Sequence, residues 1–267
     1  SDEAVKFNDK LFEFYSYHAI AASNELAKER GSYESFDGSL WSKGMLPIDT
    51  FKSLMEYRNQ DSSSVSQTQD WDSLRQSIQE HGMRNSNTMA IAPTATIGYI
   101  NGVEQSIEPN FSVLFVYENK SGNFYIMNEH FVKDMKMEGL WTPEIISMVK
   151  EADGDVSLLN GTLPDWIKEK YKTAFDRDML QLIKSNAVRQ KWIDQGISFN
   201  LYNKSTSLKY LNDIYMACWE AGLKTTYYLR NRGASKVEKS NTTSEKAPAT
   251  TEVKACSILD PGCESCQ

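Results

Sequence analysis

Short apolar runs alternate with amphipathic segments along most of the chain, and this alternation restricts the fold more than any other feature. Strands are expected at 87–92, 197–202 and 223–229, and a hairpin is expected from strands at 111–118 and 123–127. Helices are expected between them. Because strands that alternate with helices pair mainly in parallel, the sequence predicts an α/β fold.

The amphipathic segments carry apolar residues at the three- and four-residue spacing of a helix. Gly31 ends the first segment, Pro47 begins the second, and the third is expected to be capped by Asp70 and ended by Gly82. The expected helices are 3–30, 47–57, 71–82, 129–139, 143–152, 164–194 and 206–221.

The composition changes abruptly at Gly233. The stretch 233–255 has no aromatic residue, and Val237 and Val253 are its only larger aliphatic residues. Such a stretch cannot bury enough apolar surface to offset the entropy of ordering, so it is expected to be a flexible linker. As a coil of about 30 residues, the segment from Gly233 to Cys263 would span about 30 Å. The expected parts are a folded region (1–232), the linker (233–255) and a cysteine tail (256–267).

Composition and charge exclude several classes of protein. Hydrophobic residues make up 40% and charged residues 24% of the 267 residues, which is ordinary for a globular protein. The net charge of −7 argues against binding duplex DNA by neutralising phosphates, so no nucleic-acid partner is expected. No apolar run could span a membrane and no export leader begins the chain, so no membrane partner is expected. The cysteines do not form a secreted disulfide scaffold, which indicates a reducing, cytoplasmic location.

The segment 92–98 (APTATIG) lies between an expected strand and an expected helix. Its small residues allow close approach to an anion, and the free N–H groups of a helix start, with two hydroxyls, can hold a phosphate or diphosphate. The alternative is an ordinary helix capped by a threonine. The candidate substrate-binding residues are Pro93, Thr94, Ala95, Thr96 and Ile97.

A second motif, SIEPN (106–110), follows shortly after. The proline holds Glu108 in an extended conformation, from which the carboxylate could line a pocket or could only cap or turn the chain.

A third motif, KTTYYLR (224–230), contains Tyr227 and Tyr228 side by side. Adjacent residues of a strand face opposite sides, so the pair would not normally stack and is compatible with an ordinary core strand. If the backbone turns the two phenols toward each other, they can be steps of a one-electron oxidation. Each phenol would then lose a proton with its electron, which requires a close hydrogen-bond partner.

The tail contains Cys263 and Cys266 as a CxxC pair, with Cys256 upstream. A CxxC pair on a flexible tether is suited to thiol–disulfide exchange. The alternative is a zinc site, but the tail offers three cysteines and no histidine where four ligands are needed. No metal site is therefore expected.

Together, and in this order, the motifs resemble the large subunit of class I ribonucleotide reductase. The stretches that carry the resemblance are ASNELAKERG (22–31), KGMLPIDT (43–50), RNSNTMAIAPTATI (84–97), SIEPN (106–110), KTTYYLR (224–230) and the CxxC tail. The resemblance covers essentially the whole chain but roughly the carboxyl-terminal third of that subunit. It implies the carboxyl-terminal half of the family's ten-stranded α/β barrel, with extra helices and a flexible tail.

The resemblance also implies an activity, the reduction of ribonucleoside diphosphates to 2'-deoxyribonucleoside diphosphates. In the family, the segment that matches 93–97 binds the substrate diphosphate, largely through backbone N–H groups. The pair that matches Tyr227 and Tyr228 relays a radical from the small subunit to a catalytic cysteine. The cysteines that match Cys263 and Cys266 reduce the active-site disulfide and then pass the oxidation to thioredoxin or glutaredoxin.

One departure from the family pattern is informative. The radical-bearing cysteine and the two reducing cysteines of the family lie upstream of the matched region, and Cys218 matches none of them. The chain is therefore expected to be inactive alone, as a fragment or as one product of a split large subunit, and to need an amino-terminal part. No cofactor is expected on this chain, because the radical metallocofactor belongs to the partner small subunit.

Two alternatives remain open. An adenosylcobalamin-dependent class II reductase shares the phosphate segment, but it makes its radical beside the cysteine and needs no tyrosine relay. A non-catalytic phosphate-binding assembly module would explain 92–98, but it gives no purpose to a CxxC pair behind a linker.

Overall fold

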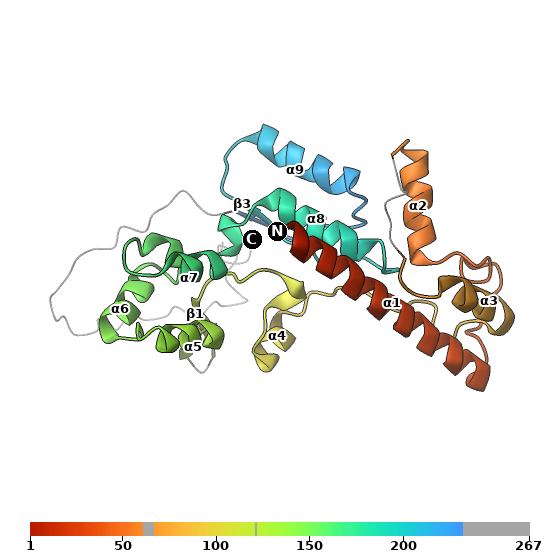
Figure 1. Cartoon of the computed structure of the whole chain (residues 1–267), viewed down its shortest axis with the longest axis horizontal. Coiled ribbons are helices and arrows are strands. Elements are labelled where there is room, and N and C mark those ends of the chain that lie inside the picture. The colour runs from red at the N-terminus through yellow and green to blue at the C-terminus, as the bar shows by residue number, and fades with distance from the viewer. Residues whose placement is uncertain (61–66, 121, 232–267) are drawn as a thin grey trace, which may run out of the picture. The chain divides into compact units, whose positions relative to one another are not determined.

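The computed structural model describes residues 1–60, 67–120 and 122–231, and the predicted linker and cysteine tail lie outside the described residues (Figure 1). The α-helices are α1 (Asp2–Arg30), α2 (Pro47–Tyr57), α3 (Trp71–His81), α4 (Ala95–Asn101), α5 (Glu129–Met137), α6 (Pro143–Glu151), α7 (Asp165–Lys170), α8 (Met179–Gln190) and α9 (Leu208–Glu220). Single 3₁₀ turns are η1 (Gln105–Ile107), η2 (Val156–Leu158) and η3 (Ala174–Asp176). The strands are β1 (Leu114–Asn119), β2 (Gly122–Met127), β3 (Leu201–Asn203) and β4 (Leu229–Asn231).

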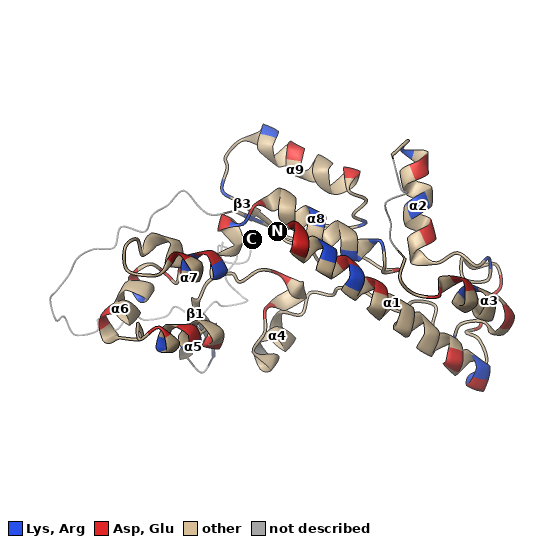
Figure 2. Cartoon of the chain, in the orientation of Figure 1, with Lys and Arg blue, Asp and Glu red and all other residues tan. Residues whose placement is uncertain are grey.

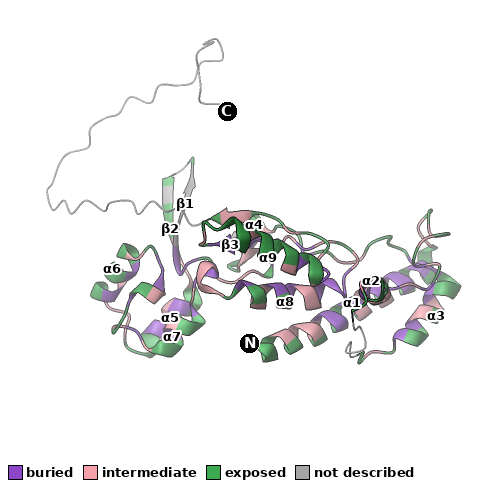
Figure 3. Ribbon diagram, turned by 90° about the horizontal axis from the view of Figure 1, so that it is seen from above, coloured by how far each residue is buried: buried purple, intermediate pink, exposed green. Residues whose placement is uncertain are grey.

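The long helix predicted at 3–30 is confirmed as α1. The side chain of Ser1 accepts a hydrogen bond from the Ala4 N–H at its start, and Gly31, with φ of 79°, donates to Ala27 O at its end. α1 packs against α3 and α8, and in Figures 1 and 3 α8 runs beside its amino-terminal half. The residues buried by this packing are Phe12, Glu13, Ser16, Ile20, Ser23, Asn24 and Ala27.

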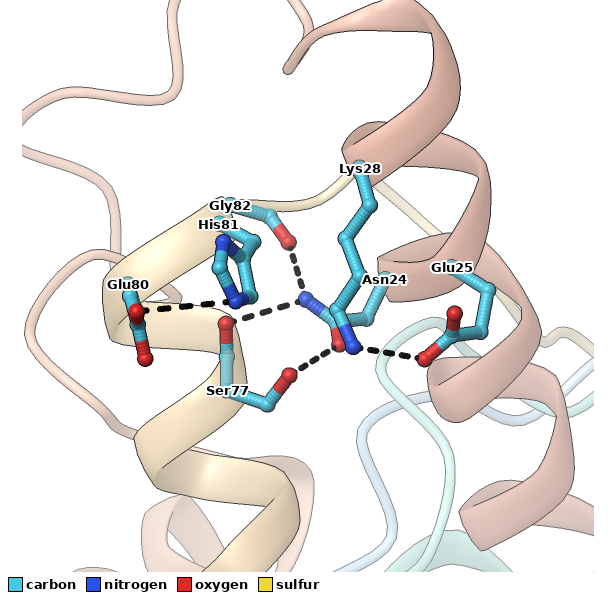
Figure 4. A network of polar contacts seen from close by, with 7 residues as sticks. All are labelled: Asn24, Glu25, Lys28, Ser77, Glu80, His81 and Gly82. Carbon is cyan, nitrogen blue, oxygen red and sulfur yellow. Dashed lines mark hydrogen bonds and ion pairs between the residues drawn. The ribbon is translucent and has the colours of Figure 1, made fainter.

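Asn24 fastens α1 to α3 (Figure 4). Its Nδ2 donates to Ser77 O (3.1 Å) and Gly82 O (2.8 Å), and its Oδ1 accepts from Ser77 Oγ (2.6 Å). The adjacent Ser23 Oγ accepts from the Asn85 N–H (2.9 Å). Asn24 thus joins α1 to α3, and Ser23 joins α1 to the stretch 84–97, so the polar residues at 23 and 24 have a structural role.

The prediction of one helix over 164–194 is wrong, because the structure divides it into α7, η3 and α8. The Ala174 N–H donates to Asn110 O (2.8 Å), a partner distant in sequence, instead of to a carbonyl of its own helix. Asp178 then starts α8 as a new N-cap, with Oδ1 accepting from the Leu180 N–H (2.9 Å). The apolar spacing continues across the break, so periodicity alone could not reveal it.

The strands include a parallel pair, as predicted, but they are shorter than the predictions. β3 pairs with β4 with Leu201 opposite Leu229, and Ile91 forms one isolated parallel bridge with Ile197. A strand extends only as far as its neighbours offer hydrogen-bond partners. Within the described residues, only Leu201 and Tyr202 of the predicted strand 197–202 and only Leu229 of the predicted strand 223–229 lie in β3 and β4. The prediction that Tyr227 and Tyr228 lie in a strand is therefore wrong, because both precede β4.

The predicted hairpin is confirmed. β1 and β2 pair antiparallel, with Leu114 opposite Met127 and Asn119 opposite Gly122. Gly122 has φ of 131°, a conformation that favours glycine at a tight turn.

Buried apolar side chains form two clusters (Figure 3). The larger one joins α1, α3, α8 and α9, and the indole of Trp192 stacks on that of Trp71 with 5.7 Å between ring centroids. The smaller one joins the hairpin to α5, α6 and α7 around Phe131, Met135 and Ile167, none of which is exposed. The larger cluster also contains Ile197, Phe199, Leu201 and Tyr202. It therefore supports β3 and the residues just before it, which contact the candidate site residues described below.

The charged residues of α1 lie towards its two ends, at 2–13 and 25–30, whereas its middle and the whole of α4 carry none (Figure 2). Of the helices that the structure describes, none is both long and apolar enough to cross a membrane.

Candidate functional site

The predicted phosphate segment forms a loop and the first turn of α4, in which the Gly98 N–H donates to Thr94 O (2.6 Å). In the described part of the chain, the N–H groups of residues 95–97 have no hydrogen-bond acceptor, as expected for the start of a helix. The exposed residues of the segment are Ala92, Pro93, Ala95, Thr96 and Ile97. The structure therefore presents free N–H groups and small side chains at an accessible turn.

The alternative of an ordinary helix capped by a threonine requires the Thr94 side chain to cap α4, and it does not. Its Oγ1 accepts from the Ser106 N–H (3.0 Å), and Ser106 Oγ donates to Ala92 O (3.0 Å). The two motifs 92–98 and 106–110, which the sequence offered separately, are thus one hydrogen-bonded unit.

Gly98 allows the segment 92–98 and the loop that precedes Ser106 to lie in close contact. A Cβ at position 98 would lie 2.8 Å from Val103 O, shorter than any allowed contact, so a larger residue would push the two loops apart. The second loop also bends sharply, because Ser106 (φ 54°) and Ile107 (φ 57°) are both in the left-handed region that residues other than glycine rarely adopt.

The bent loop places the Glu108 carboxylate beside the start of β3. Glu108 Oε1 accepts from the Asn200 N–H (2.8 Å), and Oε2 accepts from the Tyr202 hydroxyl (2.6 Å). Burial raises the pKa of the Glu108 carboxyl, against the lowering effects of both hydrogen bonds and of the Arg230 charge. Burial raises the pKa of Tyr202 as well, and the nearby carboxylate adds to this shift. Glu108 thus ties the loop to a strand instead of capping a helix.

Tyr227 and Tyr228 face each other. The Tyr227 hydroxyl donates to the Tyr228 hydroxyl (3.2 Å), and the ring centroids are 4.0 Å apart at an angle of 41°. The Tyr228 hydroxyl raises the pKa of the Tyr227 phenol above its ordinary value. A tyrosine relay required the backbone to turn the two phenols toward each other, and the structure has this arrangement.

A bulge in the parallel pairing explains how neighbouring tyrosines share a side. The register that places Leu201 opposite Leu229 would send the Tyr228 N–H to Phe199 O. Instead, the Tyr227 N–H takes that carbonyl (2.7 Å), while the Leu201 N–H still reaches Tyr228 O (2.9 Å). One extra residue is thus inserted just before the paired strands β3 and β4, opposite residues 199 and 200, and an insertion of this kind re-aims the side chains beside it.

The slipped pairing leaves the Tyr228 N–H without a backbone acceptor, and the side chain of Asn200 accepts from it. Asn200 was not identified from the sequence. Its Oδ1 accepts from the Tyr228 N–H (3.3 Å), and the residue is 1% exposed. The signal in the sequence was an amide within the run ISFNLY (197–202), where a strand interior otherwise carries β-formers. Arg230 was also missed; its guanidinium carbon lies 5.4 Å from the centre of the Tyr228 ring.

The other chemical candidates are not brought to this unit. Cys218 is a buried free thiol on α9, and burial raises its pKa to about 11, which disfavours the reactive thiolate. Cys256, Cys263 and Cys266 lie outside the described residues. Among the residues that the structure describes, no group of three or more His, Cys, Asp or Glu side chains could hold a metal ion.

Comparison with known families and proteins shows the family of the chain. The family model described as "Ribonucleotide reductase, barrel domain" matches residues 1–229. The chain therefore belongs to the ribonucleotide reductase family, and its α/β elements are part of that family's barrel domain.

Similar proteins identify the subunit. The chain is 43% identical, over its whole length, to the ribonucleoside-diphosphate reductase subunit alpha of Chlamydia pneumoniae, of which it covers 27%. It is 35% identical, again over its whole length, to the large subunit of Caenorhabditis elegans, of which it covers 33%. The alpha subunit of the class Id reductase of Actinobacillus ureae matches with a TM-score of 0.62 and 29% identity over 88% of this chain and 35% of that one. The chain corresponds to about a quarter to a third of the length of these large subunits.

Proposed function

We propose that this chain is the part of a class I ribonucleoside-diphosphate reductase large subunit that carries the diphosphate-binding segment, the tyrosine relay and the shuttle cysteines. The complete enzyme would reduce ribonucleoside diphosphates to 2'-deoxyribonucleoside diphosphates by radical chemistry. The observation that carries the proposal is the 3.2 Å contact between the hydroxyls of Tyr227 and Tyr228. Tyr227 and Tyr228 lie just before β4, where the backbone has not yet taken up regular strand geometry. In a regular strand the two side chains would point to opposite sides, so their contact depends on this irregular segment.

The chemistry of the pair is a transfer of one electron and one proton. If Tyr228 is oxidised to a phenoxyl radical, the Tyr227 O–H bond breaks, its proton and one electron pass to Tyr228, and the Tyr228 O–H bond forms. The radical then resides on Tyr227 and can be passed to a cysteine of the remaining subunit. The hydrogen bond from the Tyr227 hydroxyl to the Tyr228 hydroxyl supports this coupling, because it is the path along which the proton can move with the electron.

The diphosphate is proposed to bind at residues 93–97. Three observations support this: the N–H groups of residues 95–97 are free, α4 has no acidic side chain that would repel an anion, and the side chain of Ala95 is small and exposed. The hydrogen bond from Ser106 to Thr94 Oγ1 holds the turn in this conformation.

Thr94→Val and Thr96→Val are each expected to weaken substrate binding modestly, and Ala95→Trp is expected to weaken it more. Thr94→Val removes the acceptor of the Ser106 N–H that holds the turn, and Thr96→Val removes a hydroxyl proposed to bond the phosphate. One such hydrogen bond contributes about 0.5–1.5 kcal/mol, whereas tryptophan would cover the free N–H groups. The measurement is the KM for a nucleoside diphosphate in the reassembled enzyme. Unchanged KM values for all three variants would exclude the segment as the diphosphate site.

The proposed partner for the rest of the fold is the remainder of the large subunit. α1 has a second, outward apolar stripe of residues at alternating three- and four-residue spacing, opposite its buried face. The stripe consists of Phe7, Leu11, Phe14, Tyr15 and His18, and Phe7 is 65% exposed. Relatives are about three to four times as long as this chain, so several hundred residues of the subunit are available to cover the stripe.

The chain alone is expected to show no reductase activity, and mixing it with the remaining large subunit and a small subunit is expected to restore it. The reason is that the cysteine that initiates catalysis in the family lies upstream of the matched region. The measurement is deoxyribonucleotide formation with each component omitted in turn. Phe14→Glu should prevent assembly because it places a charge in the stripe, whereas Lys6→Gln, an exposed position on another face of the same helix, should not. Turnover by the isolated chain would refute the proposal.

The remaining partners follow from the same proposal. A small subunit would supply the radical metallocofactor, and no cofactor is proposed on this chain. Thioredoxin or glutaredoxin would be reached through Cys263 and Cys266, and these reductants imply a cytoplasmic location.

A class II reductase is the second candidate, and the Tyr227–Tyr228 contact disfavours it because a radical generated beside the cysteine needs no relay. The similarity to subunits named alpha or large, including one titled class Id, also supports class I. A non-catalytic phosphate-binding module would leave both the tyrosine pair and the CxxC pair unexplained.

A further inference from the structure

Glu108 is a half-buried carboxylate that the proposed chemistry does not use, yet both of its oxygens accept hydrogen bonds. Oε1 accepts from the N–H of Asn200, whose side chain contacts Tyr228, and Oε2 accepts from the hydroxyl of Tyr202 on β3. We propose that Glu108 is the positioning residue of the tyrosine pair: it holds Asn200, and Asn200 holds the bulge that turns Tyr227 and Tyr228 toward each other. This inference rests on the proposed relay only for its functional consequence, since the geometry is independent of it.

The first step is the dependence of Asn200 on Glu108. The backbone N–H of Asn200 is buried, and its acceptor is Glu108 Oε1 at 2.8 Å. A buried N–H without an acceptor is costly, so loss of the carboxylate would drive this part of the chain to move toward another acceptor. The Tyr202 hydroxyl, bonded to Oε2, makes the attachment a two-point one and fixes its direction.

The second step is the dependence of the bulge on Asn200. The slipped pairing leaves the Tyr228 N–H without the carbonyl that a regular ladder would supply, and Asn200 Oδ1 is the acceptor that replaces it. If Asn200 shifts, the regular register becomes the better arrangement for the Tyr228 N–H. That register would place the two tyrosines on opposite sides and separate their hydroxyls.

The third step concerns the loop that delivers the carboxylate. Ser106 and Ile107 have consecutive positive φ angles, which persist only where the surroundings enforce them. The bonds of Ser106 to Thr94 and Ala92 and the bond from Arg189 Nη1 to Ile107 O (3.4 Å) supply that constraint. The function of this strained turn is then to place the Glu108 carboxylate against Asn200 and Tyr202.

The test is a ¹⁹F NMR titration of the full chain with 3-fluorotyrosine incorporated at position 227. The hydroxyl contact with Tyr228 is expected to hold the phenol pKa above that of the same label in the unfolded chain. Glu108→Ala is expected to abolish this elevation. Glu108→Gln is expected to retain it, because the amide oxygen still accepts from the Asn200 N–H. Glu104→Gln, a neighbouring carboxylate with no bond to β3, is the matched control and should leave the titration unchanged.

A turnover assay in the reassembled enzyme separates this inference from the relay itself. Glu108→Ala should lower kcat on the order of tenfold, the effect of losing one hydrogen bond to a charged group, with KM unchanged. An altered titration with unchanged kcat would retain the positioning role and contradict the relay.

An unaltered titration in Glu108→Ala, or equal losses in Glu108→Ala and Glu108→Gln, would overturn the positioning role, since the second result would assign the effect to charge. If Glu108→Ala does not fold, Asn200→Ala removes the same link one step later. That variant should then lose the elevated pKa, and retention of the elevation would overturn the inference.

Discussion

Tyr227→Phe and Tyr228→Phe are each expected to abolish turnover driven by the small subunit while leaving the fold and substrate binding nearly intact. Phenylalanine keeps most of the shape and the burial of tyrosine but removes the O–H that must exchange the electron and proton. Both side chains are about half exposed, so the loss of one hydroxyl should not disturb the core. The measurements are kcat in the reassembled enzyme and the binding of the nucleoside diphosphate.

Tyr125→Phe is the matched control, because Tyr125 is an exposed tyrosine of the hairpin strand β2. It should retain full activity. Near-normal turnover in both Tyr227→Phe and Tyr228→Phe would reduce the pair to an ordinary structural feature and remove the main support for class I.

Cys263→Ser and Cys266→Ser are each expected to abolish multiple turnover with thioredoxin, with a first turnover still observed. A single remaining thiol cannot reduce the active-site disulfide and then form the intramolecular disulfide that thioredoxin accepts. Turnover with dithiothreitol, which reaches the active site directly, should persist. The assay therefore compares the two reductants in the same preparation.

Cys256→Ser, outside the CxxC pair, is the control and should have a smaller effect. Equal loss of activity with both reductants would argue against a shuttle. Release of stoichiometric zinc on mutation of the tail would instead support the structural alternative.

Local signals in the sequence predicted most helices correctly. Asp70 and Gly82 bound α3, Pro47 begins α2, and Gly31 ends α1, each for a reason contained within a few residues. The helix predicted over 164–194 failed because the bond from Ala174 to Asn110 joins segments far apart in sequence.

The candidate site was predictable in its motifs but not in its assembly. Thr94 and the tyrosine pair stand in recognisable patterns, and Glu108 was noted without a function. Their connection through Ser106 and Asn200 could not be foreseen, because it depends on a loop with positive φ angles and on a slip in strand pairing. Neither feature has a local sequence signal of its own.

The sequence by itself determined the α/β class, the family and the chemical groups available to the chain, because these follow from residue types and their order. Only the tertiary structure decided that Tyr227 and Tyr228 face each other, although neighbours in a strand normally point apart. The physical reason is the contest for backbone hydrogen bonds between 199–201 and 227–229. The side-chain amide of Asn200 accepts from the Tyr228 N–H, and the carboxylate of Glu108 accepts from the Asn200 N–H. These two acceptors determine which backbone bonds form, and only folding brings them to the same place.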